Sequence, residues 1–165
     1  MDMSVRTFDE IFLETNGAIH AYVSRRISWD IDDIVDDVYV TAWRKKEAIP
    51  TDDKEALLWL FAVARRVIAN KVRFKSRFDR FNKLNNPLLV SAATQRSSQE
   101  TFVHEALVAL NKDHREALML VEWDGLSTAE AAQVLEIPET TLTKRLHSAR
   151  EAFAQTYSVI EEREK

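Results

Sequence analysis

The sequence predicts an all-α protein of two small helical domains joined by a flexible linker. Glycine occurs only twice and proline three times in 165 residues. Hairpins, parallel sheets and phosphate-cradling loops rely on glycine at their turns, so they are poorly supported. Apolar residues recur instead at the i, i+3, i+4, i+7 spacing of helix faces, and this periodicity stops between residues 82 and 101. We therefore expect domains at residues 1–82 and 102–160, with the linker at residues 83–101.

Three helices are expected in the first domain. The first has an apolar face from Phe8 to Ile27, and the second should begin after Asp30, a residue type common at helix N-caps. Pro50 then interrupts the chain, and a third helix follows. The second helix should bury Ile34, Val35, Val38, Ala42 and Trp43, and the third Leu57, Leu60, Phe61, Ala64, Ile68 and Val72.

Polar residues dominate the predicted linker. Asparagine, serine, threonine and glutamine prevail there, and only Leu88, Leu89 and Val90 form an apolar run. This composition is typical of a segment between domains.

Helical periodicity resumes at Val103, and Asn111 to Asp113 should divide the first two helices of the second domain. Gly125 should end the second of these, since glycine is favoured just after a helix. Ser127 and Glu130 have the spacing of a capping box and predict a short helix that ends near Leu135.

A last helix is expected after Pro138. Its apolar residues are spaced by four, three and four positions, and the polar tail from Ser158 to Lys165 is expected to fray. The side chains that should face inward are Leu142, Leu146, Ala149 and Phe153.

Composition excludes several classes of protein. Cysteine is absent, which rules out disulfide scaffolds, thiol nucleophiles and cysteine-based metal sites. The longest apolar run, from Ala56 to Ala64, is too short to cross a bilayer, and the N-terminus lacks the layout of a signal peptide. The histidines lack ligand spacing, and we find no catalytic set. We therefore expect a cytoplasmic protein that is not an enzyme, does not insert into a membrane and needs no metal or cofactor.

Positive charge is concentrated in one stretch of an acidic chain. Residues 65–83 hold 8 basic residues against Asp79, a net charge of +7, whereas residues 1–53 carry −6 and residues 104–165 carry −5. Such a block suits a polyanion, although a lone basic run is more commonly a solvated helix face. Aromatic residues are interleaved with these cations, as single-strand binding requires, or else they are core positions. The residues in question are Trp59, Phe74, Phe78 and Phe81.

Residues 127–150 have the pattern of a helix-turn-helix. The first helix is rich in alanine, which allows a close crossing, and only a short turn separates it from the second. The second presents short hydroxyls and cations away from its apolar stripe, as a recognition helix in a major groove does. These polar residues are Thr140, Thr141, Thr143, Lys144, Arg145, His147 and Ser148. An ordinary helical hairpin with a polar face is the alternative.

Several segments together resemble the extracytoplasmic-function (ECF) sigma factors, a compact branch of the sigma-70 family. The residues from Asp32 to Lys45 resemble region 2.2, and those from Trp59 to Arg73 resemble regions 2.3 and 2.4. The chain from Leu110 to Arg150 resembles region 4, although Glu136 stands where glycine is common.

This resemblance implies a role for each surface. Core RNA polymerase would be bound near Asp32, Asp33, Asp36, Asp37, Trp43 and Arg44. The melted strand of the promoter −10 element would contact the loop from Glu47 to Lys54 and the basic helix, with Trp59, Arg65, Arg66, Asn70, Arg73, Lys75 and Arg77. The last helix would read the −35 element as duplex, and family members are commonly held inactive by an anti-sigma factor.

The predicted function is therefore that of a sigma factor, which binds core RNA polymerase, recognises promoter DNA and opens its strands. The main alternative is a stand-alone helix-turn-helix regulator that acts on duplex DNA, and a helical adaptor for other proteins is a second. A stand-alone regulator requires neither the basic-aromatic helix nor the acidic helix before it.

Overall fold

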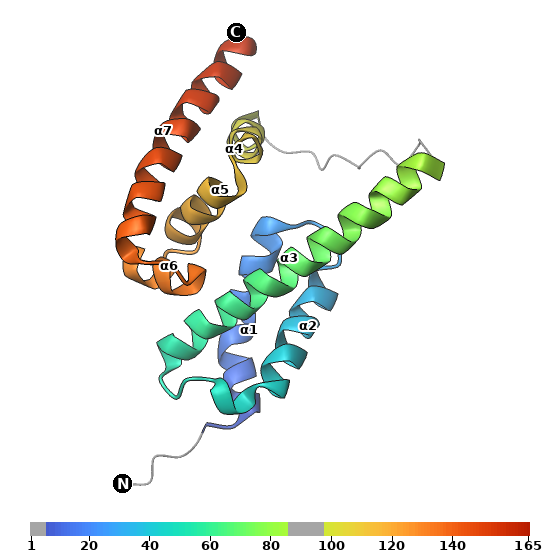
Figure 1. Ribbon diagram of the computed structural model, residues 1–165, viewed down its shortest axis with the longest axis vertical. Helices are drawn as coiled ribbons and strands as arrows, with labels where there is room; N and C mark the ends of the chain where they lie inside the picture. Colours follow the sequence, from blue (N-terminus) through green and yellow to red (C-terminus); the bar gives the residue numbers. More distant parts are fainter. Residues whose placement is uncertain (1–5, 86–97) are drawn as a thin grey trace. The chain divides into compact units, whose positions relative to one another are not determined.

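Helices account for nearly all of the structure, a computed structural model that describes residues 6–85 and 98–165; no strand occurs in these ranges. The chain divides into two compact units, Met1–Val90 and Ser91–Lys165 (Figure 1). Residues 86–97, most of the predicted linker, lie outside the described residues. The helices on either side extend into its two ends, because one continues to Asn85 and the next begins at Ser98.

The first unit is a bundle of three helices that pack pairwise against one another. These are α1 (Phe8–Arg26), α2 (Ile31–Arg44) and α3 (Asp53–Asn85), with a short 3₁₀ turn, η1 (Lys46–Ala48), between the last two. All three helices were expected from the sequence. Their shared core is apolar, and its fully buried side chains include Ile19, Tyr22, Val23, Ile34, Val38 and Leu60.

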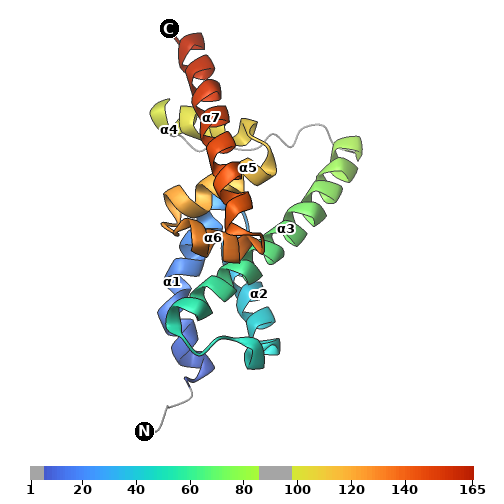
Figure 2. The same cartoon turned by 60° about the vertical axis from the view of Figure 1, so that its left-hand side comes forward.

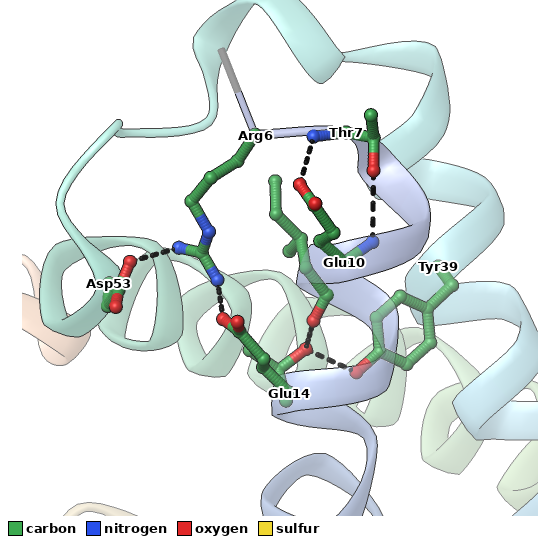
Figure 3. Close-up of polar contacts among 8 residues, drawn as sticks. Arg6, Thr7, Glu10, Glu14, Tyr39 and Asp53 are labelled. Carbon is green, nitrogen blue, oxygen red and sulfur yellow. Dashed lines mark hydrogen bonds and ion pairs between the residues drawn. The ribbon is translucent and has the colours of Figure 1, made fainter. Parts of the chain in front are cut away.

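A network of polar contacts secures the start of α1 (Figure 3). Thr7 and Glu10 form a capping box, each side chain accepting a hydrogen bond from the other's backbone N–H. The guanidinium of Arg6 bridges Glu14 on α1 and Asp53 at the start of α3. The first residues of α1 are thereby tied both to their own helix and to α3.

Trp43 does not lie in the core, contrary to the sequence-based prediction. Its side chain is 52% exposed, and Tyr39, at 6%, is buried on this side of α2 instead. The Trp43 ring meets Phe8 edge to face at a centroid distance of 5.0 Å. Because Phe8 opens α1 and Trp43 is in the last turn of α2, the pair lies where the bundle ends and few atoms are left to cover the indole.

The start of α2 also differs in detail from the prediction. Asp30 occupies the N-cap position, but its side chain makes no capping hydrogen bond. Its backbone is left-handed, with φ 48° and ψ 34°, and its carbonyl accepts the first helical hydrogen bond from the N–H of Ile34.

The helix α3 is much longer than the helices that cover it. With a rise of 1.5 Å per residue, its 33 residues span about 50 Å, against about 29 Å for α1 and about 21 Å for α2. The last buried side chain among its described residues is Ile68, and Val72, expected in the core, is 44% exposed. The C-terminal end of α3 projects beyond the bundle, as Figures 1 and 2 show.

In the second unit, the shorter helices pack along α7 (Glu139–Arg163). They are α4 (Ser98–Ala109), α5 (Lys112–Leu118), a π-helical turn η2 (Met119–Trp123) and α6 (Thr128–Leu135). Most of the expected boundaries are confirmed. The side chain of Asn111 caps α5 by accepting a hydrogen bond from the His114 N–H, at 2.8 Å. Gly125 has the expected positive φ, 72°, and Ser127 and Glu130 form the capping box.

The expectation that the C-terminal tail frays is wrong for most of its length. The helix α7 continues to Arg163, and Ile160 is only 5% exposed. Tyr157 stacks on Phe153 at 6.0 Å and meets Phe102 of α4 at 6.5 Å. Because α4 packs against the second half of α7, it supplies an apolar surface that the polar composition of the tail did not indicate.

No helix in residues 6–85 or 98–165 is both long and apolar enough to span a membrane. Within the same ranges, no group of three or more acidic or histidine side chains is placed to hold a metal ion.

Candidate functional site

The turn between α6 and α7 brings the two helices of the predicted helix-turn-helix together. Ala131 and Ala132 on α6 are buried, so the backbones of the two helices can approach closely. Glu136 ends α6 in a left-handed conformation, with φ 57° and ψ 41°, and Pro138 precedes the first residue of α7. The backbone N–H of Ile137 bonds back to the carbonyl of Ala132 at 3.1 Å, which closes the turn.

The structure places the seven predicted duplex-contacting residues in the first half of α7. Six of them have exposed side chains, namely Thr140, Thr141, Thr143, Lys144, His147 and Ser148. Thr143 donates a hydrogen bond to the Glu139 carbonyl at 3.0 Å. Its hydroxyl is therefore partly satisfied by its own helix.

Arg145 differs from the other six because its side chain is partly buried. It lies beside the start of α5, where an open cavity of about 440 Å³ is lined by Asn111, Lys112, Asp113, His114 and Arg145. Arg145 thus stands at the edge of the exposed face of α7, whereas Lys144 stands within it.

Arg115, which was not among the predicted site residues, joins α5 to the C-terminal end of α4. The guanidinium of Arg115 donates hydrogen bonds to the carbonyls of Leu107, Val108 and Leu110, each at 2.9 Å. These carbonyls lie at the C-terminal end of α4, where helices leave acceptors unsatisfied and favour a cation. The only sequence signal was a basic residue a few positions after a predicted helix end.

Four of the seven predicted strand-contacting residues share one side of α3. Arg66, Asn70, Arg73 and Arg77 are exposed and follow one another at i, i+4, i+7 and i+11. The guanidinium of Arg73 donates a hydrogen bond to the Asn70 side-chain oxygen at 3.4 Å, so these two groups lie together.

The remaining three do not join this row. Trp59 and Arg65 are half-buried. The amine of Lys75 lies 5.0 Å from the ring centroid of Trp29 and 3.8 Å from a carboxylate oxygen of Asp79. Lys75 is therefore engaged on another side of the helix.

The acidic residues of α2 border the basic helix. Asp32, Asp33 and Asp36 are exposed, whereas Asp37 pairs with Lys71 of α3 at 2.8 Å. This hydrogen bond raises the pKa of the Lys71 amine above its ordinary value of 10.5. Trp43 and Arg44 are exposed at the far end of α2, and the amine of Lys46 lies over the Trp43 ring at 4.5 Å.

Comparison with known proteins identifies the family. Residues 103–153 match the family model "Sigma-70, region 4", which covers the helix-turn-helix described above. The ECF RNA polymerase sigma factor SigL of Mycobacterium tuberculosis is 31% identical over 133 residues, which cover 76% of this chain and 73% of SigL. The chain belongs to the ECF RNA polymerase sigma factors. Another relative, the ECF RNA polymerase sigma-E factor of Escherichia coli, is 25% identical over an alignment of 168 positions, which covers 90% of this chain and 85% of the relative.

Solved structures share the fold of this ECF sigma factor. The sigma factor RpoE from Bartonella quintana, in complex with the anti-sigma factor NepR, matches with a TM-score of 0.70 at 22% identity over 92% of this chain and 97% of RpoE. CnrH, in complex with the cytosolic domain of CnrY, matches with a TM-score of 0.67 at 20% identity over 92% of this chain and 88% of CnrH.

Proposed function

We propose that this ECF sigma factor binds core RNA polymerase in the cytoplasm and divides promoter recognition between its two units. The second unit reads the −35 element as duplex DNA, and the first unit binds the opened −10 strand. The single observation that supports this division most directly is the presence of two separate exposed polar surfaces in one chain. One is the exposed face of α7, and the other is the row of cations on α3. The chain acts by binding alone and catalyses no reaction.

The face of α7 suits a major groove. Hydroxyls, an imidazole and the amine of Lys144 stand exposed within its first three turns. A helix of this kind places donors and acceptors against base edges, while the preceding helix crosses the DNA backbone.

The row on α3 suits a single strand rather than a duplex. Arg66, Arg73 and Arg77 supply positive charge along one line, and the side chain of Asn70 lies within it. Strand opening then follows from binding, since the free energy of capturing unstacked bases offsets the cost of opening the duplex.

The acidic helix α2 is the proposed docking surface for polymerase. Its exposed carboxylates, Asp32, Asp33 and Asp36, suit a basic partner, and Trp43 adds apolar surface at the other end of the helix. Asp37 contributes less, because it is already paired with Lys71.

An anti-sigma factor is a further proposed partner. The solved sigma factor RpoE, which shares this fold, is described in complex with the anti-sigma factor NepR. Because the chain contains no cysteine, it does not itself sense thiol oxidation. Any such signal would have to act through the partner.

A stand-alone regulator is the less favoured function. Such a protein has no use for an acidic α2 next to a basic α3, and membership of the ECF sigma factors argues against it. Nanomolar, sequence-specific binding to duplex DNA by the free chain at physiological salt would support this alternative.

Binding to core polymerase, followed by run-off transcription from a promoter library, tests the proposal. We expect the wild-type chain to bind core polymerase and direct transcription from a subset of promoters. The triple variant Asp32→Asn, Asp33→Asn, Asp36→Asn should lose much of its binding to polymerase. The matched control is Glu161→Gln, Glu162→Gln, Glu164→Gln, which removes the same charge from exposed positions of the second unit and should bind normally. Equal binding by both variants would contradict the assignment of α2.

A further inference from the structure

The face of α3 that packs on the bundle changes its chemistry after Ile68. Ala64 and Ile68 are buried on this face, and Lys71 and Lys75 continue it at i+7 and i+11 from Ala64. In the part of α3 whose side chains are described, no residue after Ile68 is buried. The stripe that begins in the core therefore ends in two partly exposed lysines.

Both lysines contact parts of the bundle outside α3. The amine of Lys71 pairs with Asp37 of α2 at 2.8 Å. The amine of Lys75 lies 5.0 Å from the ring centroid of Trp29, which is half-buried in the connection between α1 and α2. An ammonium group within about 6 Å of an aromatic centroid is attracted to the face of the ring. Polar contacts thus replace apolar packing where the core ends.

The surroundings of the two amines do not suit a phosphate. A carboxylate oxygen of Asp79 lies 3.8 Å from the Lys75 amine, and the Lys71 amine is already paired with Asp37. A phosphate that approached either amine would be repelled by the carboxylate beside it. These two lysines are therefore better suited to hold α3 than to hold DNA.

The strand-binding row of the proposed function lies on the other side of α3. The row from Arg66 to Arg77 has the same spacing as the stripe from Ala64 to Lys75, but it is shifted by two residues. At 3.6 residues per turn, a shift of two residues is about 200° around the helix. The contacts that fasten Lys75 to the bundle therefore determine which way the row faces.

We propose that Trp29 is a positioning residue for this row. Together with Lys75, and with the Lys71–Asp37 pair beside it, Trp29 holds the part of α3 beyond Ile68 so that the row faces the opened strand. The inference rests on the proposed function, which assigns the strand to the row. Neither Trp29 nor Lys75 contacts the DNA. A helix end that is already held in place loses less conformational freedom when it binds, and this preorganisation raises its affinity.

A direct contact between Lys75 and the strand, as predicted from the sequence, is the competing interpretation. It assigns no role to Trp29, because the indole carries no charge and lies outside α3. The two interpretations therefore differ in the effect they expect from a substitution of Trp29.

Substitutions of Trp29 test the positioning role. Trp29→Leu removes the aromatic face but keeps an apolar side chain, and Trp29→Phe keeps a smaller aromatic face. Each full-length variant is assembled with core RNA polymerase and titrated with a fluorescent single strand that carries the −10 element of a promoter found by run-off transcription. We expect Trp29→Leu to bind the strand about two- to fivefold more weakly, the range set by one exposed cation–π contact, and Trp29→Phe to recover most of the affinity.

The matched control is Ser76→Ala, at an exposed position of α3 next to Lys75, and it should bind the strand like wild type. The affinity for core polymerase should be the same in wild type, both Trp29 variants and the control. A weaker affinity for the strand at unchanged affinity for polymerase is the result that a general structural role of Trp29 would not produce.

Salt dependence shows whether Lys75 contacts the strand. Lys75→Gln should weaken strand binding as Trp29→Leu does, but it should leave the slope of log affinity against log salt unchanged. Arg77→Gln, in the row, should reduce the steepness of this slope by about 0.7, the value for one phosphate contact on a single strand. The double variant Trp29→Leu, Lys75→Gln should bind no more weakly than the weaker single variant, because both substitutions break the same contact.

Three results would overturn the inference. They are unchanged strand affinity in Trp29→Leu, a shallower salt slope in Lys75→Gln, and a joint fall in strand affinity, polymerase affinity and melting temperature in Trp29→Leu. In each case, strand binding and transcription by the wild-type complex would show that the proposed function still stands. Failure of the wild-type complex to bind the strand would instead refute the proposed function, and the inference with it.

Discussion

Glu136 adopts a backbone conformation that suits glycine better than any other residue. Its φ of 57° lies in the left-handed region, where a side chain costs about 1–2 kcal/mol. Glycine is the common residue at this point, just after a helix. The turn between α6 and α7 therefore stores strain.

Replacing this residue should stabilise the second unit. We expect Glu136→Gly to raise the free energy of unfolding by about 0.5–1 kcal/mol, because the relief of strain exceeds the added freedom of the unfolded chain. Thermal unfolding followed by circular dichroism measures the change. The matched control is Gln133→Gly, at an exposed position inside α6, which should destabilise by a similar amount. A lower melting temperature for Glu136→Gly would show that its side chain contributes more than its backbone costs.

Trp43 is a surface residue, and its ring packs edge to face against Phe8 at the end of the bundle. Truncation of a buried tryptophan costs about 3–5 kcal/mol, but half of this side chain is already exposed. We expect Trp43→Ala to lower the free energy of unfolding by only about 1–2 kcal/mol, mainly through the lost contact with Phe8. Urea unfolding tests the stability, and a pull-down with core polymerase tests the docking role. A loss above about 3 kcal/mol would restore the sequence-based view that Trp43 belongs to the core.

At the scale of elements, two polar contacts fasten α2 to its neighbours. The hydroxyl of Tyr39 on α2 lies 2.7 Å from the hydroxyl of Thr15 on α1. The Thr15 hydroxyl in turn donates a hydrogen bond to the Ile11 carbonyl at 2.7 Å. On the other side, Asp37 pairs with Lys71 of α3. Burial raises the pKa of Tyr39 above 10.0, and the bond to Asp37 raises that of Lys71 above 10.5.

These shifts predict a loss of stability in alkali. For both groups, the pKa is higher in the folded than in the unfolded state, so their contribution is fully present below about pH 10. This contribution is lost as the pH rises through the pKa values of the folded state, because Tyr39 and Lys71 release their protons at lower pH in the unfolded chain. Urea unfolding of the first unit at several pH values should show a decline that begins near pH 10. Tyr39→Phe should make the decline shallower, and an unchanged slope in this variant would contradict the role of Tyr39.

At the scale of the whole molecule, variants of the two proposed DNA-binding surfaces should lose transcription activity in different ways. Lys144→Ala, Ser148→Ala should weaken recruitment to a paired −35 element by about 1–3 kcal/mol, and a template already mismatched at the −10 element should not restore activity. Arg73→Ala, Arg77→Ala should impair strand opening, and the mismatched template should restore much of the activity. Run-off transcription with core polymerase on both templates measures these effects.

The alternative is that both surfaces are simple phosphate anchors. Both variants would then lose activity equally on the two templates, and each would show a shallower salt dependence. Equal rescue of both variants by the mismatched template would also refute the division of labour.

The sequence alone determined the helical class, most helix boundaries and the family. Local signals carried these results, because a capping box such as Ser127 with Glu130, or the glycine at position 125, acts through the backbone within a few residues. The exposed face of α7 could be predicted for a similar reason, since an apolar stripe of regular period leaves the opposite side of the helix to solvent.

Only the tertiary structure decided which stretches of each apolar stripe are covered. Trp43 and Val72 continue their stripes in the sequence but are exposed, whereas Ile160 lies in a polar tail and is still buried. The hydrogen-bond and ion-pair partners of Arg115 and Asp37 could not be predicted from the sequence either, because these contacts join different helices. Burial and pairing depend on where each helix ends relative to its neighbours, and a periodic pattern along one helix carries no information about the length or position of another.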